Sequence, residues 1–491
     1  MDRYDRSSFP LLGSSPFTLK ALSESLLDAL GHAPTAGQSK AARALERLMA
    51  SERSRPVLVV KGYAGTGKTS LVGALVQVLV REGRPVVLLA PTGRAAKVLS
   101  AYSGSPASTI HRRIYRMRDD GSALRSAVHR DEGALFIVDE ASMIGNGNGG
   151  GEGPFGDRDL LSDLFDHVFS APRCRLLLIG DPAQLPPVGS DESPALDVKG
   201  LHDHYALTAG AVELKEVVRQ QAGSGILENA TMLRHLLDVR TPMPRFLLGH
   251  KDVHRVDGTG LQDALETAFS RHGQEEVCVI TRSNKRAYLY GQQVRARILG
   301  FEEELCPGDR LMVVRNDYFW AARNGKPELI ANGEQVEVLR VGALEERYGS
   351  RFCSVDIAWS SSEERREGEV MIMLDVIGSE APALPFAQRR RLQEAILATT
   401  AHRSHAARTN ALRQDPFANA LQVKYAYAVT CHKAQGGQWR SVFVDQGYVT
   451  EDMIDREYMR WLYTAITRAS ENLFLLNFHP RFFGEDERGS T

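Results

Sequence analysis

The segment GYAGTGKT at residues 62–69 has the spacing of a phosphate-binding loop. Its glycines let the backbone bend so that N–H groups point at phosphates, and the helix start that follows adds positive potential. The pattern predicts that Lys68 reaches the β and γ phosphates and that the Thr69 hydroxyl holds magnesium. A glycine-rich turn without a ligand is the alternative, which the flanking strand and helix patterns disfavour. The predicted nucleotide-binding residues are Gly62, Tyr63, Ala64, Gly65, Thr66, Gly67, Lys68, Thr69 and Ser70.

Two adjacent acids, Asp139 and Glu140, follow the apolar run 135–138. Beside a nucleotide, Asp139 is predicted to bind magnesium and Glu140 to polarise the attacking water. Adjacent acids at a strand end are commonly solvated turn residues, and alone these two would be read that way. Together with the phosphate loop they indicate a site that hydrolyses a nucleotide.

A third apolar run ends in GDPAQLPPVG at 180–189, which places the amide of Gln184 where it can sense a γ-phosphate. Local pattern alone leaves a proline-rich turn equally open. Arg219 and Arg468 lie far along the chain from the phosphate loop. An arginine brought across a domain cleft onto a γ-phosphate accelerates hydrolysis by about 10³ to 10⁵. A surface salt bridge is the alternative for either arginine.

Two segments, APTGRAAK at 90–97 and STIH at 108–111, follow strand patterns and begin helices. Their free N–H groups and hydroxyls can hold a phosphate of a nucleotide or of a nucleic acid. A capped helix start is a fair alternative, because threonine is an expected cap and arginine is usually solvated. The candidates for such contacts are Thr92, Arg94 and His111.

The elements that position these residues follow from short apolar runs between helical patterns. Continuous apolar runs that end in Gly, Pro or acidic residues predict strands buried on both faces of a parallel sheet, hence an α/β fold. A middle region, 301–420, instead shows alternating stretches typical of antiparallel strands in a small barrel. The predicted parallel strands are 56–61, 85–90, 134–138 and 174–179, with a second group at 277–282, 441–444 and 472–476.

Composition excludes several classes of protein. The 491 residues, 43% hydrophobic and 25% charged, are typical of roughly two to four globular domains and exclude a disordered chain. The net charge of -1 offers no overall attraction to nucleic acid or lipid, so a polyanion needs a local basic path. The five cysteines lack a Cys-x-x-Cys pair, which argues against a disulfide framework or a cysteine zinc site. With no predicted signal peptide or membrane span, we expect a soluble cytoplasmic protein.

The ordered series of motifs resembles superfamily 1 DNA helicases, and more narrowly the RecD-like and Dda-like 5′ to 3′ branch. Beyond the segments above, the series includes Gln38, LKEVVRQ at 214–220, VTCHKAQGGQW at 429–439 and LYTAITRA at 462–469. The resemblance covers about residues 34–478, and the ordered set is far more specific than any single motif.

The resemblance implies two RecA-like P-loop motor domains with ATP and Mg²⁺ between them and single-stranded DNA across their tops. It implies that Gln38 reads adenine, that Arg219 and Arg468 are arginine fingers, and that Gln435 and Gly436 couple nucleotide state to DNA. Tailed duplex DNA is the implied substrate, with single-stranded-DNA-binding or repair proteins as further partners and a monomer as the expected state. The implied DNA contacts are Thr92, Arg94, His111, Thr430 and His432.

The expected division of the chain also follows from the resemblance. It comprises an N-terminal segment at 1–33, motor domain 1A at 34–205 with a pin 1B at about 114–131, and an inserted SH3-like domain 2B at 301–420. Motor domain 2A takes the remainder, 206–300 and 421–491. The segment 116–130 is short and has no aromatic after Tyr115, which puts a stacking wedge at the pin in question. The glycine-rich segment 145–157, predicted as a surface loop, has no counterpart in the family.

The expected function is therefore an ATP-dependent DNA helicase and translocase that moves 5′ to 3′ and acts in repair, recombination or replication. Two alternatives stay open at this point. An RNA helicase or remodeler would share the motor motifs, because these contact the phosphate backbone. A DNA-stimulated ATPase subunit that acts as a switch would bind DNA and hydrolyse ATP without separating strands.

Overall fold

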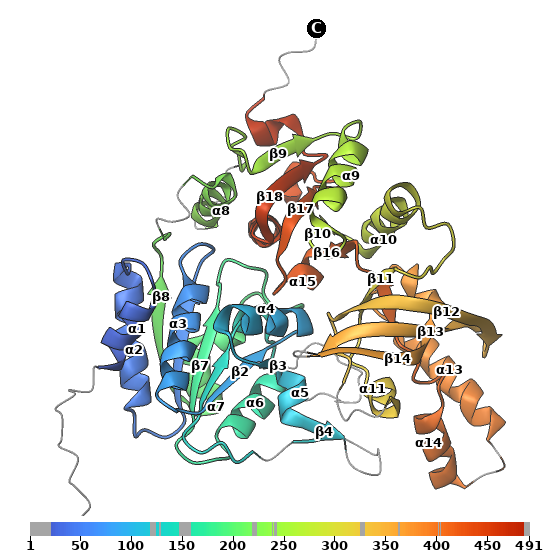
Figure 1. Cartoon of the computed structure of the whole chain (residues 1–491), viewed down its shortest axis with the longest axis horizontal. Coiled ribbons are helices and arrows are strands. Elements are labelled where there is room, and N and C mark those ends of the chain that lie inside the picture. Colours follow the sequence, from blue (N-terminus) through green and yellow to red (C-terminus); the bar gives the residue numbers. More distant parts are fainter. Residues whose placement is uncertain are drawn as a thin grey trace, which may run out of the picture.

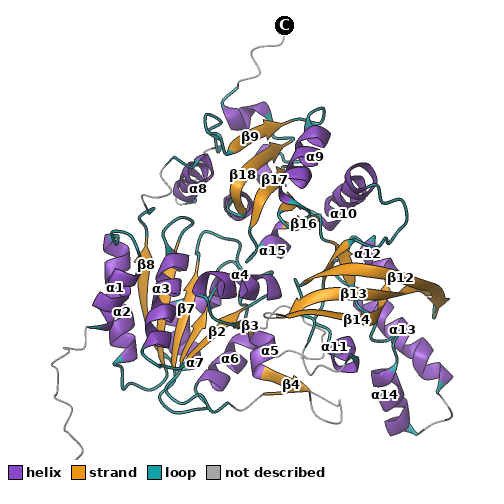
Figure 2. Ribbon diagram, viewed as in Figure 1, coloured by secondary structure: helices purple, strands orange, loops and turns teal. Residues whose placement is uncertain are grey.

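The structure, a computed structural model, contains three larger β-sheets and one two-stranded pair (Figures 1 and 2). Two of the larger sheets are parallel, and the third is antiparallel and lies beside both. The α/β class with parallel sheets predicted from the apolar runs is thus confirmed. No helix among the described residues is long and apolar enough to span a membrane. The described residues are 21–117, 124–126, 129–146, 159–218, 223–237, 239, 243–324, 329–361, 364–400, 402 and 404–485.

The first sheet has the strand order β3-β2-β6-β7-β1-β8, and all its neighbouring strands are parallel. The central strands are apolar and buried along most of their length, as strands covered on both faces must be. The strands are β1 (Pro56–Gly62), β2 (Val86–Ala90), β3 (Ala107–Thr109), β6 (Leu135–Val138), β7 (Arg175–Gly180) and β8 (Thr208–Leu214). Its helices are α1 (Leu22–Ala29), α2 (Ala36–Met49), α3 (Lys68–Arg81), α4 (Gly93–Ser103), α5 (Ile110–Ile114), α6 (Leu160–Val168) and α7 (Val198–Tyr205).

The first unit is larger than the expected domain 34–205 at both ends. Strand β8 pairs with β1 along its whole length, so the predicted boundary between 205 and 206 is wrong. At the other end, α1 packs into the same core as α2 and α3, so its residues are not a separate N-terminal segment. Both errors have one cause, because pairing and packing between distant segments leave no mark in the local pattern.

The second sheet has the order β16-β10-β17-β18-β9 and is also parallel throughout. In Figure 1 it lies above the first sheet. Its strands are β9 (Val253–Val256), β10 (Val277–Thr281), β16 (Ala428–Thr430), β17 (Trp439–Asp445) and β18 (Ala469–Leu476). Its helices are α8 (Gly225–Leu236), α9 (Leu261–His272), α10 (Asn284–Gln293), α15 (Cys431–Ala434) and α16 (Arg456–Ile466).

The third sheet is antiparallel, with the order β14-β13-β12-β11-β15, and four of its strands come from the region expected to be inserted. Strand β15 pairs with β11, so this sheet extends to Tyr425, past the expected domain end at 420. Its core is continuous with one face of the second parallel sheet. The strands are β11 (Arg310–Val313), β12 (Gln335–Arg347), β13 (Ser350–Ser361), β14 (Glu364–Met373) and β15 (Val423–Tyr425). The helices are α11 (Phe319–Arg323), α12 (Leu374–Ile377), α13 (Phe386–Thr399) and α14 (His405–Gln414).

The last sheet is a short antiparallel pair, β4 (Tyr115–Met117) with β5 (Leu124–Ser126). It falls within the segment expected to form the pin. Most of the glycine-rich segment 145–157 lies outside the described residues.

Candidate active site

The phosphate loop lies where β1 ends and α3 begins, at the carboxyl edge of the first sheet, which is where open parallel sheets bind their ligands. Gly65 and Gly67 have φ of 72° and 80°, in the left-handed region that favours glycine. A Cβ added to Gly67 would come within 2.4 Å of Gln38 Nε2 and 2.9 Å of Val218 Cγ2. Only glycine therefore fits at this turn.

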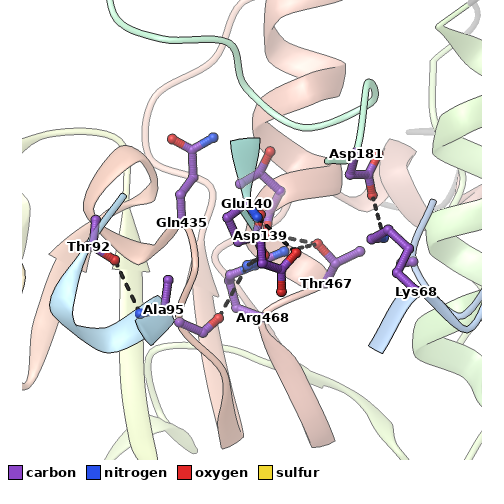
Figure 3. A network of polar contacts seen from close by, with 12 residues as sticks. Lys68, Thr92, Ala95, Asp139, Glu140, Asp181, Gln435, Thr467 and Arg468 are labelled. Atoms are coloured by element: carbon purple, nitrogen blue, oxygen red, sulfur yellow. Dashed lines mark hydrogen bonds and ion pairs between the residues drawn. The ribbon is translucent and has the colours of Figure 1, made fainter. Parts of the chain in front are cut away.

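Lys68 is held inside the loop by its own neighbours. Its Nζ donates to the carbonyl oxygens of Gly62 at 2.7 Å and Tyr63 at 2.9 Å. It also lies 3.9 Å from Asp181 Oδ2, as Figure 3 shows. Thr69 is exposed in the first turn of α3. The ammonium group is thus already at the mouth of the loop, and its present partners are carbonyls that it can exchange for phosphate oxygens.

The acid pair comes directly after β6. Asp139 accepts hydrogen bonds from Tyr102 Oη at 2.5 Å and from the Glu140 backbone N–H at 2.8 Å. Burial, followed by the charge of Glu140, raises the pKa of Asp139 to about 6. Glu140 itself has a φ of 52°, uncommon for a residue with a side chain. Such backbone strain persists only where the surrounding structure imposes it, and it gathers at functional sites.

Arg468 reaches this acid pair from the second sheet. Its side chain is buried and lies with Nη1 3.9 Å from Glu140 Oε1 (Figure 3). The guanidinium is oriented by the carbonyls of Thr464 at 3.0 Å and Gly437 at 3.3 Å. A predicted arginine finger and a predicted catalytic acid, distant in sequence, therefore face each other across the two sheets. Arg219 lies outside the described residues.

The loop after β7 contributes two side chains to the same place. Gln184 is buried, and its Oε1 has no hydrogen-bond partner among the described residues. Asp181 accepts from Tyr463 Oη at 2.7 Å and from the Ala183 N–H at 2.9 Å. Burial raises the pKa of Asp181, while Lys68 and these hydrogen bonds act in the opposite direction. Sequence reasoning quoted this segment for Gln184 and missed Asp181; the acid directly after a strand is the signal that could have found it.

The HKAQG motif packs against the first unit. Gln435 Nε2 donates to the Leu185 carbonyl at 2.6 Å, next to Gln184. Gly436 has a φ of 70°, and a Cβ there would meet Ala95 Cβ at 2.8 Å. Both residues thus bridge the two parallel sheets rather than lining the phosphate loop.

Gln38 fits a nucleotide base. It caps α2 with Thr35 in a reciprocal box, and its Oε1 accepts from the Thr35 N–H at 3.0 Å. Its Nε2 is buried beside Gly67 with no hydrogen-bond partner in the described part of the chain. A buried amide donor normally has a hydrogen-bond acceptor. An adenine ring bound above the loop would supply that acceptor to Gln38 Nε2. The orphaned Gln38 and Gln184 atoms, the lysine and the acid pair together suit ATP with Mg²⁺.

The candidate DNA contacts are spread around this site. The Thr92 hydroxyl accepts from the Ala95 N–H at 3.2 Å, which is the capped helix start (Figure 3). Arg94 stacks over the Trp439 ring at 3.9 Å and donates to the Gln438 carbonyl at 2.7 Å, so here it joins the two parallel sheets.

The other three candidates are His111, Thr430 and His432. Burial lowers the pKa of His111 to about 4, so its ring is neutral at physiological pH. Thr430 ends β16 and lines a small pocket with Lys424 and Lys433, and His432 follows in α15.

Comparisons with known proteins agree with this arrangement. Residues 34–237 match the model of an AAA domain, and residues 425–476 match that of a UvrD-like helicase C-terminal domain. The ATP-dependent RecD2 DNA helicase of Deinococcus radiodurans is 28% identical over 330 residues, which cover 64% of this chain and 41% of that protein. The ATP-dependent DNA helicase dda of Enterobacteria phage T4 is 28% identical over 318 residues, covering 60% of this chain and 64% of that protein.

Among solved structures, Pif1 helicase from Bacteroides in complex with ADP-AlF3 and ssDNA gives a TM-score of 0.43 at 16% identity, covering 91% of this chain and 93% of that one. The chain spans less than two thirds of the length of the two curated relatives.

Proposed function

We propose that the chain is an ATP-dependent DNA helicase and translocase that moves 5′ to 3′ along single-stranded DNA and separates duplexes. Its similarity to the RecD2 and Dda helicases, in line with the resemblance carried by its motifs, supports this proposal. The observation that carries this proposal is the approach of Arg468 to Glu140 across the two parallel sheets. It makes a hydrolytic site that is complete only when both sheets contribute, which is what a motor needs in order to link hydrolysis to movement.

The residues have the following roles in this proposal. Lys68 and the N–H groups of the phosphate loop hold the β and γ phosphates, and Gln38 holds the base. Glu140 aligns the water that attacks the γ-phosphorus and takes its proton, while Arg468 and Arg219 neutralise the charge that develops. Thr69 and Asp139 would hold Mg²⁺, which would offset the negative charge of the phosphates. Gln184 senses the γ-phosphate.

The same proposal assigns the larger parts. The first and second parallel sheets are the RecA-like motors 1A and 2A, the antiparallel sheet is the SH3-like domain 2B, and the β4–β5 pair is the pin 1B. Single-stranded DNA passes over Thr92, Arg94, His111, Thr430 and His432. Because phosphate contacts position a strand without reading its sequence, little sequence preference is expected. The protein is proposed to work as a cytoplasmic monomer.

The test is ATP-dependent strand displacement on duplexes that carry either a 5′ or a 3′ single-stranded tail, with Lys68→Ala as the inactive control. Displacement from the 5′ tail alone is expected. Displacement only from the 3′ tail would refute the polarity. DNA-stimulated ATP hydrolysis without displacement from either tail would replace the helicase by an ATPase switch, and equal stimulation by matched RNA strands would refute the DNA preference.

A further inference from the structure

The hydroxyl of Tyr463 joins the two parallel sheets inside the nucleotide site. Tyr463 lies on α16 of the second unit and is 1% exposed. Its oxygen accepts from the Ala64 backbone N–H at 2.7 Å and donates to Asp181 Oδ2 at 2.7 Å. These partners are 399 and 282 residues away along the chain. One phenol oxygen therefore connects α16 to the phosphate loop and to the loop after β7.

Both partners belong to the phosphate-binding machinery of the first unit. Ala64 is part of the loop whose N–H groups cradle phosphates, and Asp181 faces Lys68 at 3.9 Å (Figure 3). The next residue of α16 acts on the same loop, since Thr464 Oγ1 accepts from the Leu185 N–H at 2.8 Å. Two consecutive side chains of α16 thus hold both ends of the segment 181–185, which contains Gln184.

The buried charge of Asp181 explains why a hydroxyl-bearing side chain occupies position 463. Asp181 is fully buried, and its carboxylate needs donors to offset the loss of water. When Lys68 turns from the loop toward bound phosphates, the Tyr463 hydroxyl and the Ala183 N–H remain as donors. Burial raises the pKa of Tyr463 well above its ordinary value, so the hydroxyl keeps its proton at neutral pH.

We propose that Tyr463 is a positioning residue for ATP hydrolysis, one that holds Ala64 and Asp181 in register with α16 when the two parallel sheets meet. This inference rests on the proposed ATP hydrolysis at the same site. The groups expected to bind ATP belong to the first unit, whereas Tyr463 belongs to the second. Loss of its hydroxyl should therefore affect the hydrolytic step, for which Arg468 must face Glu140, far more than the binding of ATP.

The test compares Tyr463→Phe with Tyr458→Phe in the full chain. Tyr458 is also buried on α16, but among the described residues its hydroxyl bonds within the second unit, to Gln446 at 3.3 Å. With saturating single-stranded DNA, Tyr463→Phe is expected to lower kcat for ATP by about 10- to 100-fold, the effect of losing one buried hydrogen bond to a charged group, with KM within about threefold of wild type. Tyr458→Phe should keep the wild-type kcat.

Asp181→Asn tests the same hydrogen bond from its acceptor in the first unit. This variant provides the test if Tyr463→Phe does not fold. It too should lower kcat, and the double variant should be no slower than the slower single variant, because both changes break one connection. Three results would each overturn the inference. They are a double variant whose loss of kcat is the product of the two single losses, a wild-type kcat in Tyr463→Phe, and a Tyr463→Phe protein with a raised KM and an unchanged kcat. A wild-type protein without Lys68-dependent ATP hydrolysis would overturn the proposed function as well, so the two failures are distinguishable.

Discussion

The two parallel sheets share one architecture but end their strands differently. After β1 the chain enters a loop of glycines with positive φ, whereas after β10 it passes into α10 through a short turn capped by Ser283. The half-buried acid directly after β6, Asp139, is bonded by Tyr102 and a backbone N–H. The buried acid at the end of β17, Asp445, is instead saturated by Arg286, Tyr290 and Asn477.

This difference shows how one fold serves both chemistry and scaffolding. Where the protein satisfies the polar groups at a strand end, as at Asp445, the acid stabilises the fold. Where it leaves a buried polar atom without a partner among the described residues, as at Gln184 Oε1, a ligand can complete the hydrogen bonding. In the proposed function, the second sheet contributes to catalysis by the side chains that it extends to the first, Arg468 and Tyr463 among them.

The strongest test of the comparison replaces the lysine in the first turn of the helix that follows β1, and then the lysine in the first turn of the helix that follows β10. Lys68→Ala should reduce ATP hydrolysis to background, because no other cation in the loop replaces its contact with the phosphates. Lys285→Ala, at the start of α10, should leave hydrolysis unchanged, since Lys285 is exposed and pairs with Glu380. Steady-state ATPase assays with single-stranded DNA measure both. Wild-type ATP hydrolysis in Lys68→Ala would contradict the assignment of the nucleotide site to the carboxyl ends of the strands in the first sheet.

The second prediction concerns the arginine that the second sheet contributes. Arg468→Ala should lower kcat by about 10³, as expected for an arginine finger, while ATP still binds the first unit. Arg440→Ala provides the control, because Arg440 is an exposed arginine of the same sheet that pairs with Glu471. Single-turnover hydrolysis together with equilibrium ATP binding separates the two effects. An Arg468→Ala protein that hydrolyses ATP normally would reduce the second sheet to a scaffold.

The third prediction tests, through protein stability, the structural role of the acid at the end of β17. Asp445→Asn should lower the free energy of unfolding by about 1–3 kcal/mol, because it weakens a charged network around a fully buried carboxylate whose arginine partner is partly exposed. The same change should leave ATP binding intact. Urea denaturation and ATP titration provide the measurements. Unchanged stability in Asp445→Asn would remove the structural role assigned to this acid.

The fourth prediction uses the raised pKa of Asp139. With its pKa at about 6, the folded protein retains a proton that the unfolded chain releases from about pH 4 upward, so the contribution of Asp139 to stability falls as pH rises from about 4 to 6. In metal-free buffer, Asp139→Asn should therefore be more stable than wild type at pH 7 by about 1–3 kcal/mol, and equal to it near pH 4. Denaturation at the two pH values checks the sign, and a destabilised Asp139→Asn at pH 7 would contradict it.

The smallest expected effect belongs to Gln38. Gln38→Ala should weaken the preference for ATP over GTP by about 10-fold, the cost of one hydrogen bond to the base, with kcat at saturating ATP largely kept. Competition binding with the two nucleotides measures the preference. A loss of kcat with the preference retained would assign Gln38 to the catalytic step instead of to the base.

The sequence predicted much of the site and of the sheets. The predicted strands at 56–61, 134–138 and 277–282 agree with β1, β6 and β10 to within a residue or two, since buried parallel strands are short apolar runs with clear ends. It placed the residues of β8 in the second motor domain, whereas β8 pairs with β1 of the first sheet. It offered Arg94 for a phosphate contact or for solvent, and did not foresee that this side chain stacks on Trp439.

The sequence by itself determined the phosphate loop, the acid pair and the helix caps, because each depends on residues only a few positions apart and on local backbone preferences. The tertiary structure decided which distant side chains meet them: Arg468 at Glu140, Tyr463 at Ala64 and Asp181, and Gln435 at Leu185. Such contacts form only when two separately folded sheets are brought to within hydrogen-bonding distance, and no local pattern records that distance.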